Sequence, residues 1–203
     1  AALQSAHDAG IRAVAVALLH GYVNPAHEAR IGEIAAAGDW DVGEGAAQSI
    51  DIIDAYVDRL VEGFAGSAFR IGWDAGNGAA GPVIEALTAR LPGQHVLLYT
   101  KVDGHFPNHH PDPSDPANLQ DLVQTVKRFD ADLGIAFDGD GDRLGVVTPD
   151  GTIIFADRLL MLFAADVLLR NPGAMVIYDV KCTGKLADFV LRHGGSPMMW
   201  KTG

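Results

Sequence analysis

Hydrophobic and polar positions along the chain predict alternating helices and strands from residue 50 onward. Between residues 53 and 64 apolar side chains recur every three or four positions, which is typical of an amphipathic helix. The short apolar runs at 69–73 and 133–137 lack this period and end in Asp- and Gly-rich stretches, which predicts buried strands. This alternation favours an α/β fold with a mixed sheet. We expect further helices at 82–91, 119–129, 157–169 and 184–193, and further strands at 95–100, 144–148, 152–155, 174–180 and 197–200.

Turn residues divide this pattern into two units. Residues 149–151, Pro-Asp-Gly, are typical of a turn between domains. We therefore predict one α/β domain at 50–152, followed by a truncated second α/β domain at 153–203. The second unit has about fifty residues, near the lower limit for an independent hydrophobic core.

The N-terminal residues follow a different pattern. Residues 1–30 contain an apolar run at 13–19, which predicts a strand, and a helix is expected at 25–37 with Asn24 as its N-cap and Pro25 at its first position. We expect residues 1–30 to be a segment of different origin and residues 31–49 to be a linker.

Composition predicts a folded, soluble globular protein. The chain has 203 residues, and 48% of them are hydrophobic. No run of 18 apolar residues predicts a membrane span, and residues 1–12 do not resemble a secretory signal. The single cysteine, Cys182, excludes an intrachain disulfide and fits a reducing cytoplasm.

Charge narrows the possible partners. The net charge of −11 argues against a nucleic acid, because phosphate backbones are bound by basic patches. An anionic phosphate would need local positive charge, for which the candidates are a bound cation, Arg143 and Lys181.

The run Asp138-Gly139-Asp140-Gly141-Asp142-Arg143 is the main candidate for chemistry, and it follows the predicted strand 133–137. In an extended strand, carboxylates at alternate positions would stand about 6.6 Å apart, too far for one cation. The two glycines allow the chain to curl until the three carboxylates converge. The sequence therefore predicts a loop that can hold a divalent cation.

Three interpretations of this acidic loop compete. An EF-hand calcium loop needs Gly at its sixth position and Glu at its twelfth, where this chain has Arg143 and Pro149. A solvated acidic turn is less favourable, because close carboxylates repel one another unless a cation neutralises them. The favoured interpretation is a Mg²⁺ site with open positions for a phosphate oxygen and with Arg143 as a further anion contact.

A second motif admits a cofactor interpretation. Gly76, Gly78 and Gly81 match the dinucleotide-binding pattern, and Asp103 follows about twenty residues later. An NAD-binding domain is thus an alternative. Asp103 lies beyond the next predicted strand, however, so we favour a glycine-rich turn that brings a helix close to the sheet. For the adjacent His109 and His110, a structural or hydrogen-bonding role is favoured over zinc binding.

Read in order, the motifs resemble one family, the α-D-phosphohexomutases, in their bacterial phosphomannomutase/phosphoglucomutase branch. The resemblance extends from about residue 31 to the end. It implies that residues 50–152 are the second, metal-binding domain of a four-domain enzyme and that residues 153–203 are the first half of its third domain. The matching segments are 74–81, 102–113, 136–143, 157–160, 179–183 and 199–203.

The resemblance also implies an activity and a set of site residues. Family members are isomerases that move a phosphoryl group between the C1 and C6 hydroxyls of mannose or glucose through a hexose bisphosphate. In this chain the family's Mg²⁺ ligands would be Asp138, Asp140 and Asp142. Arg143 and Lys181 would act in catalysis and, together with Gly203, contact the hexose phosphate.

The family's phosphoserine motif is not found in these 203 residues, so we expect the isolated chain to be inactive. A catalytically inactive metal-binding module is therefore an alternative. A nucleotide-sugar transferase with an acidic metal motif is a more distant one.

Residues 11–30, in contrast, resemble a stretch of the hydantoinase/oxoprolinase proteins. The different resemblances of the two ends lead to the hypothesis of a fused or misassembled reading frame.

Overall fold

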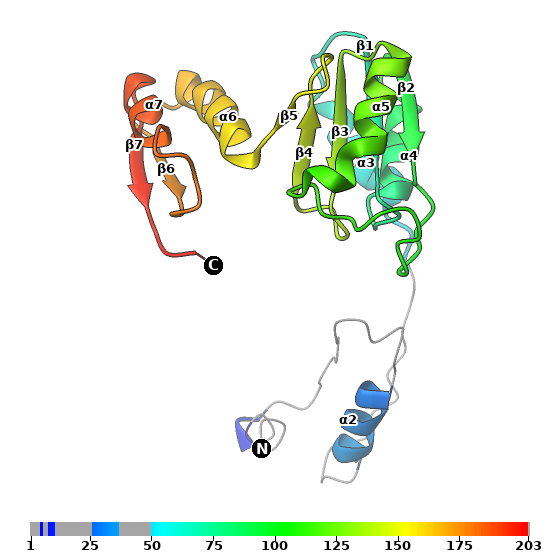
Figure 1. Cartoon of the computed structure of the whole chain (residues 1–203). Helices are drawn as coiled ribbons and strands as arrows, with labels where there is room; N and C mark the ends of the chain where they lie inside the picture. The colour runs from blue at the N-terminus through cyan, green and yellow to red at the C-terminus, as the bar shows by residue number, and fades with distance from the viewer. Residues whose placement is uncertain (1–4, 6–7, 11–25, 37–49, 203) are drawn as a thin grey trace. The chain divides into compact units, whose positions relative to one another are not determined.

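The computed structural model describes residues 5, 8–10, 26–36 and 50–202 (Figure 1). The chain divides into two compact units, residues 1–50 and 51–203. In the first unit, helix α2 (Ala26–Ala36) confirms the helix expected at 25–37. The strand expected at 13–19, the Asn24 cap and most of the predicted linker lie outside the described residues.

A five-stranded mixed sheet forms the centre of residues 51–154. Its strand order is β2-β1-β3-β4-β5, with β1 parallel to β2 and β3, and β4 antiparallel to β3 and β5. This arrangement confirms the predicted mixed α/β sheet. The strands are β1 (Phe69–Asp74), β2 (Gly93–Leu98), β3 (Leu133–Phe137), β4 (Leu144–Val147) and β5 (Ile153–Ile154).

Helices cover both faces of this sheet (Figure 1). Helix α5 (Gln120–Phe129), preceded by the 3₁₀ turn η1 (Pro116–Leu119), lies on one face and buries Leu122 and Val126 completely. Helix α4 (Gly81–Thr88) contributes Ile84 to a second cluster on the opposite face, and α3 (Ile53–Glu62) packs against α4.

Glycines at two strand positions explain how closely α5 approaches the sheet. A Cβ atom on Gly134 of β3 would lie 2.6 Å from Val126 Cγ2, and one on Gly72 of β1 would lie 3.2 Å from Leu122 Cδ1. The helix therefore occupies the space that strand side chains would otherwise fill. This packing holds α5 against β1 and β3, the two strands that lead into the candidate loops.

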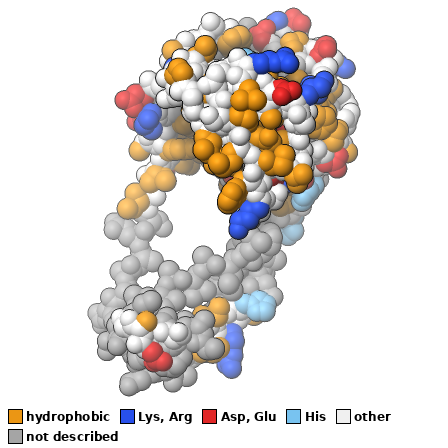
Figure 2. All heavy atoms as spheres, turned by 90° about the vertical axis from the view of Figure 1, so that its left-hand side faces the viewer, with side chains coloured by type: hydrophobic (Ala, Val, Ile, Leu, Met, Phe, Trp, Pro, Cys, Tyr) orange, Lys and Arg blue, Asp and Glu red, His pale blue; other side chains and the backbone are white. Residues whose placement is uncertain are grey.

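The remaining elements form a smaller α/β arrangement. Helices α6 (Ala156–Arg170) and α7 (Leu186–Arg192) accompany the parallel pair β6 (Met175–Tyr178) and β7 (Ser196–Met199). Their shared core contains Leu168, Leu186 and Val190. Hydrophobic side chains also gather on the molecular surface (Figure 2). The exposed hydrophobic residues of α6, β6 and β7 include Leu162, Met175, Ile177 and Met199.

One boundary prediction is wrong. The predicted boundary after residue 152 places most of the strand expected at 152–155 in the second unit, but β5 pairs with β4 and belongs to the first sheet. The reason is local, because the turn at 149–151 is tight enough to return the chain antiparallel beside β4: Gly151 has φ +87°, and the Thr148 and Thr152 backbones are hydrogen-bonded.

Among the described residues, no helix is both long and apolar enough to cross a membrane.

Candidate metal and phosphate site

The topology of the sheet brings two candidate loops to one edge. Strands β1 and β3 are parallel neighbours, so the loops that follow them, 74–81 and 138–143, leave the sheet on the same side. Ligand sites in open α/β sheets form outside the carboxyl ends of such strands. We call these segments the glycine loop and the acidic loop.

The acidic loop gathers its three carboxylates as predicted. One oxygen each of Asp138, Asp140 and Asp142 lies within 4.8 Å of the others. Gly141 has φ +78°, a left-handed conformation that favours glycine, and its N–H donates to the Asp138 carbonyl over 3.2 Å. The chain therefore curls at Gly141, and the side chains on either side of it converge.

The spacing of these oxygens fits a small divalent cation. Opposite ligands of an octahedral Mg²⁺ ion stand about 4.2 Å apart, because each bond is about 2.1 Å long. The three oxygens all lie within 4.8 Å of one another, and carboxylate oxygens are ligands that Mg²⁺ prefers. These residues could thus hold such an ion.

Burial and hydrogen bonding give the carboxylates different properties. Burial alone would raise the pKa of Asp138, but the backbone N–H of Arg143 at 3.0 Å and the guanidinium Nε at 2.7 Å lower it overall. Repulsion from Asp140 raises the pKa of the exposed Asp142. The loop therefore holds one firmly ionised, oriented carboxylate and two exposed ones whose mutual repulsion a cation would relieve.

Arg143 links the acidic loop to a distant segment. Its Nη1 donates to Asp112 Oδ1 over 3.1 Å, in addition to the Nε contact with Asp138. Asp112 also accepts hydrogen bonds from the backbone N–H and hydroxyl of Ser114, which lower its pKa. Sequence reasoning did not single out Asp112, although it lies in the long Pro- and His-rich loop between β2 and η1.

Lys181 lies in the loop after β6, close to an acidic partner. Its Nζ is 3.3 Å from Asp179 Oδ2, and its backbone N–H donates to Asp179 Oδ1 over 2.9 Å. Thr202 Oγ1 donates to the same carboxylate over 2.9 Å. Asp179 thus holds the loop of Lys181, while the ammonium group itself is largely exposed. Gly203 lies outside the described residues.

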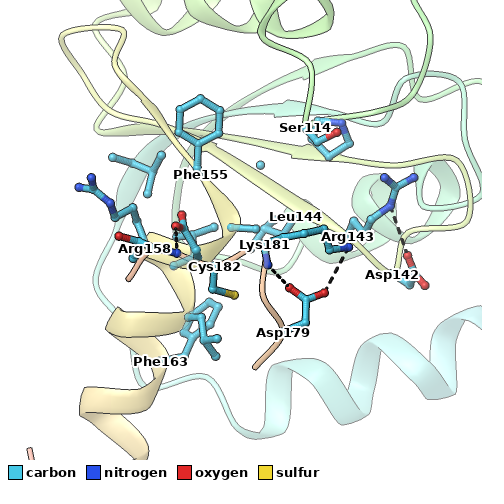
Figure 3. A pocket seen from close by; sticks show the side chains of 18 residues that line it. Ser114, Asp142, Arg143, Leu144, Phe155, Arg158, Phe163, Asp179, Lys181 and Cys182 are labelled. Carbon is cyan, nitrogen blue, oxygen red and sulfur yellow. Dashed lines mark hydrogen bonds and ion pairs between the residues drawn. The ribbon is translucent and has the colours of Figure 1, made fainter. Parts of the chain in front are cut away.

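A cavity of about 880 Å³ lies beside several of these groups (Figure 3). Asp142, Arg143 and Lys181 line it, and Ser114 and Cys182 are also on its wall. Its lining thus combines acidic and basic side chains with apolar ones. Asp138 and Asp140 are not among its lining residues, so the structure brings only part of the predicted site to this cavity.

The glycine loop serves packing. Gly76 has φ +51°, and a Cβ atom on Gly81 would overlap the carbonyl of Thr100, two residues after β2. Asp103, the acidic residue that follows the glycine pattern, accepts a hydrogen bond from the backbone N–H of His105 over 2.9 Å. These contacts agree with the favoured interpretation of a turn that brings α4 close to the sheet.

His109 has the hydrogen-bonding role expected for it. Its Nε2 is 3.0 Å from Oδ2 of the buried Asp74, and its Nδ1 is 3.0 Å from the His110 carbonyl. Among the residues that the structure describes, the acidic loop is the cluster of His, Cys, Asp or Glu that could hold a metal.

Comparison with known proteins decides the family. Residues 54–151 match the family model described as phosphoglucomutase/phosphomannomutase, alpha/beta/alpha domain II. Residues 54–151 of this chain are therefore a domain of the phosphoglucomutase/phosphomannomutase domain II type. The resemblance drawn from the sequence motifs is therefore confirmed.

Relatives in this family extend the match beyond domain II. A phosphomannomutase/phosphoglucomutase of Pseudomonas putida is 50% identical over 166 residues, which cover 81% of this chain and 36% of the relative. The Pseudomonas aeruginosa protein of the same name is 52% identical over 162 residues, covering 79% of this chain and 35% of the relative. The chain thus spans about a third of the length of these family members.

A solved structure of the family shows the same fold. A phosphoglucomutase/phosphomannomutase family protein from Burkholderia thailandensis superposes with a TM-score of 0.77 at 51% sequence identity, covering 87% of this chain and 38% of the other. The N-terminal end differs in family, because residues 1–38 match the model of the hydantoinase/oxoprolinase N-terminal region. This match confirms the second resemblance.

Proposed function

We propose that this chain provides the Mg²⁺-binding domain of a phosphohexomutase, with hexose phosphates and a hexose bisphosphate as substrate and intermediate. In this proposal the complete enzyme interconverts the 1-phosphate and 6-phosphate of mannose or glucose. The observation that carries it is the convergence of three carboxylates. The chain in which they converge is 50% and 52% identical, over 166 and 162 residues, to proteins named phosphomannomutase/phosphoglucomutase.

Asp138, Asp140 and Asp142 would hold the ion. A bound Mg²⁺ neutralises charge on a phosphoryl group and helps to position it. The fixed orientation of Asp138 supports this role, since both its oxygens already accept hydrogen bonds from Arg143. Such outer contacts orient metal ligands in many proteins.

Arg143 and Lys181 would supply the positive charge that a phosphate needs. A guanidinium carries five N–H donors, so Arg143 can hold a phosphate oxygen while it keeps its contacts with Asp138 and Asp112. Lys181 presents an exposed ammonium group on the wall of the cavity. Gly203 is proposed as a substrate contact from the resemblance alone.

In this proposal mutase activity requires the complete enzyme. The family's phosphoserine motif does not occur in these 203 residues, so we expect no mutase activity from this chain by itself.

A domain exchange tests this function directly. Residues 54–151 would replace the corresponding domain of the Pseudomonas aeruginosa relative, and the chimera would be assayed with glucose 1-phosphate, glucose 1,6-bisphosphate and Mg²⁺ in a coupled assay. We expect mutase activity, because this segment brings its own acidic loop and the strands β1 to β4 of its sheet.

The matched control is the same chimera with Asp140→Asn, in which activity should fall at least about 100-fold because a ligand of the ion is lost. A folded chimera without activity would contradict the proposal. Equal activity of the Asp140→Asn chimera would contradict the role of the acidic loop.

A further inference from the structure

The glycine loop makes direct backbone contact with the acidic loop. The N–H of Ala79 donates to the carbonyl of Gly139 over 2.9 Å. A Cβ atom on Gly78 would lie 2.7 Å from that carbonyl oxygen and 3.0 Å from the carbonyl oxygen of Asp138. Only glycine fits at position 78 without displacing the acidic loop, because its neighbours there are backbone atoms.

Asn77 fixes the shape of the glycine loop. It has φ +60° and is 5% exposed, so a residue other than glycine is buried here in the left-handed conformation, which asparagine tolerates better than most. Its backbone N–H and its Nδ2 donate to the carbonyls of Tyr99 and Lys101, each over 2.8 Å, and its Oδ1 accepts from Asn108 Nδ2 over 2.7 Å. These bonds tie the residue next to Gly78 to the long loop after β2.

Gly139 also lies close to side chains of the same long loop. A Cβ atom on Gly139 would lie 3.5 Å from Pro111 Cγ and 3.8 Å from Phe106 Cζ, which are ordinary contact distances. Gly139 is therefore held between two segments, and it is the residue that separates the carboxylates of Asp138 and Asp140.

We propose that Asn77 and Gly78 are positioning residues for the cation of the acidic loop. They hold the carbonyls of Asp138 and Gly139 in place, and thereby set the distance between the first two carboxylates, without contacting the ion. This inference rests on the proposed function, in which the acidic loop binds Mg²⁺.

The test measures the Mn²⁺ affinity of two glycine variants of the full chain. The concentration of free Mn²⁺ is followed by electron paramagnetic resonance. Gly78→Ala should weaken Mn²⁺ binding by about 10- to 100-fold, the range found when outer contacts of metal ligands are removed. Gly63→Ala is the matched control, because Gly63 ends α3 at φ −88° with no atom within 4 Å of an added Cβ. Its Mn²⁺ affinity should equal that of the wild type.

Ion selectivity separates a positioning role from a general loss of structure. Mg²⁺ requires close to ideal octahedral geometry, whereas Ca²⁺ accepts longer and more variable bonds. Competition against Mn²⁺ should therefore show that Gly78→Ala loses more affinity for Mg²⁺ than for Ca²⁺. Asn77→Gly, which keeps the left-handed backbone but removes the side-chain bonds, should change selectivity in the same direction, and it decides the question if Gly78→Ala does not fold.

Two outcomes would overturn the inference in different ways. Wild-type affinity and selectivity in folded Gly78→Ala and Asn77→Gly proteins would refute the positioning role and leave the proposed metal site standing. Absence of Mn²⁺ binding by the wild-type chain would refute both.

Discussion

Asp138 and Asp142 lie four residues apart in one loop, yet their surroundings give them opposite pKa shifts. Asp138 is buried and accepts two hydrogen bonds from Arg143, which lower its pKa despite burial. Asp142 is exposed, and repulsion from Asp140 raises its pKa. A cation would find one preoriented ligand in this loop and two that can adjust to it.

The hydrogen bond between Tyr99 and Asp121 provides a pH-dependent test of the structure at a single residue. Its hydroxyl donates to Asp121 over 2.6 Å, and this bond raises the pKa of Tyr99 from 10.0 to about 12. Between these values the unfolded chain loses the phenol proton while the folded protein keeps it. The free energy of unfolding should therefore fall as pH rises through this interval.

Urea unfolding at several pH values from about 9 to about 11 would measure this fall. Tyr99→Phe should reduce its slope, whereas Tyr56→Phe, at an exposed position of α3, should leave the slope as in the wild type. Identical slopes in the wild type and Tyr99→Phe would show that the Asp121 bond does not hold the proton.

Contacts between residues close in sequence could be predicted, whereas contacts between residues far apart in sequence could not. The three carboxylates and Arg143 are close in sequence, so their convergence could be inferred from two glycines and a preceding strand. The Arg143 contact with Asp112 joins residues 31 positions apart, and no local pattern indicates it. The partner of His109, the buried Asp74 35 positions away, could not be predicted for the same reason.

Helix α5 and strand β3 form the contact that supports the acidic loop from below. Leu122 and Val126 occupy the space above Gly134, and all three belong to segments whose apolar pattern was plain in the sequence. A change in this contact should affect the stability of the fold before it affects the chemistry of the loop.

Leu122→Ala tests that contact. The side chain is completely buried, so its removal should lower the free energy of unfolding by about 2–5 kcal/mol, as measured by urea denaturation. Leu162→Ala is the matched control, since Leu162 is 63% exposed on α6 and its loss should cost less than about 0.5 kcal/mol. Similar losses in the two variants would mean that α5 does not pack on the sheet as described.

Element prediction succeeded where periodicity was strong and failed where pairing was decided by a turn. The apolar run 133–137 coincides with β3, and the helix expected at 157–169 is found as Ala156–Arg170. The short strand near residue 153 could not be assigned to its sheet from its own residues. Its partner was set by the tight return of the chain at Gly151, which is a property of backbone conformation.

At the scale of the whole molecule, the two ends of the chain match different family models. Residues 1–38 match a hydantoinase/oxoprolinase region, and residues 54–151 match domain II of the phosphoglucomutase/phosphomannomutase family. The sequence revealed both because each carries its own motifs.

The net charge of −11 opposes the binding of anions to this chain. A phosphate would be repelled at long range and would bind only where a cation, Arg143 and Lys181 reverse the field locally. We therefore expect binding of hexose phosphate to depend on the prior presence of the ion.

Calorimetric titration of the full chain with Mg²⁺ tests the magnesium site most directly. The wild type and Asp188→Asn, which makes the same charge change at an exposed position of α7, should bind Mg²⁺ equally, and Asp140→Asn should bind at least about tenfold more weakly. Equal binding by the wild type and Asp140→Asn, or no binding by the wild type, would contradict the assignment of the acidic loop as a magnesium site.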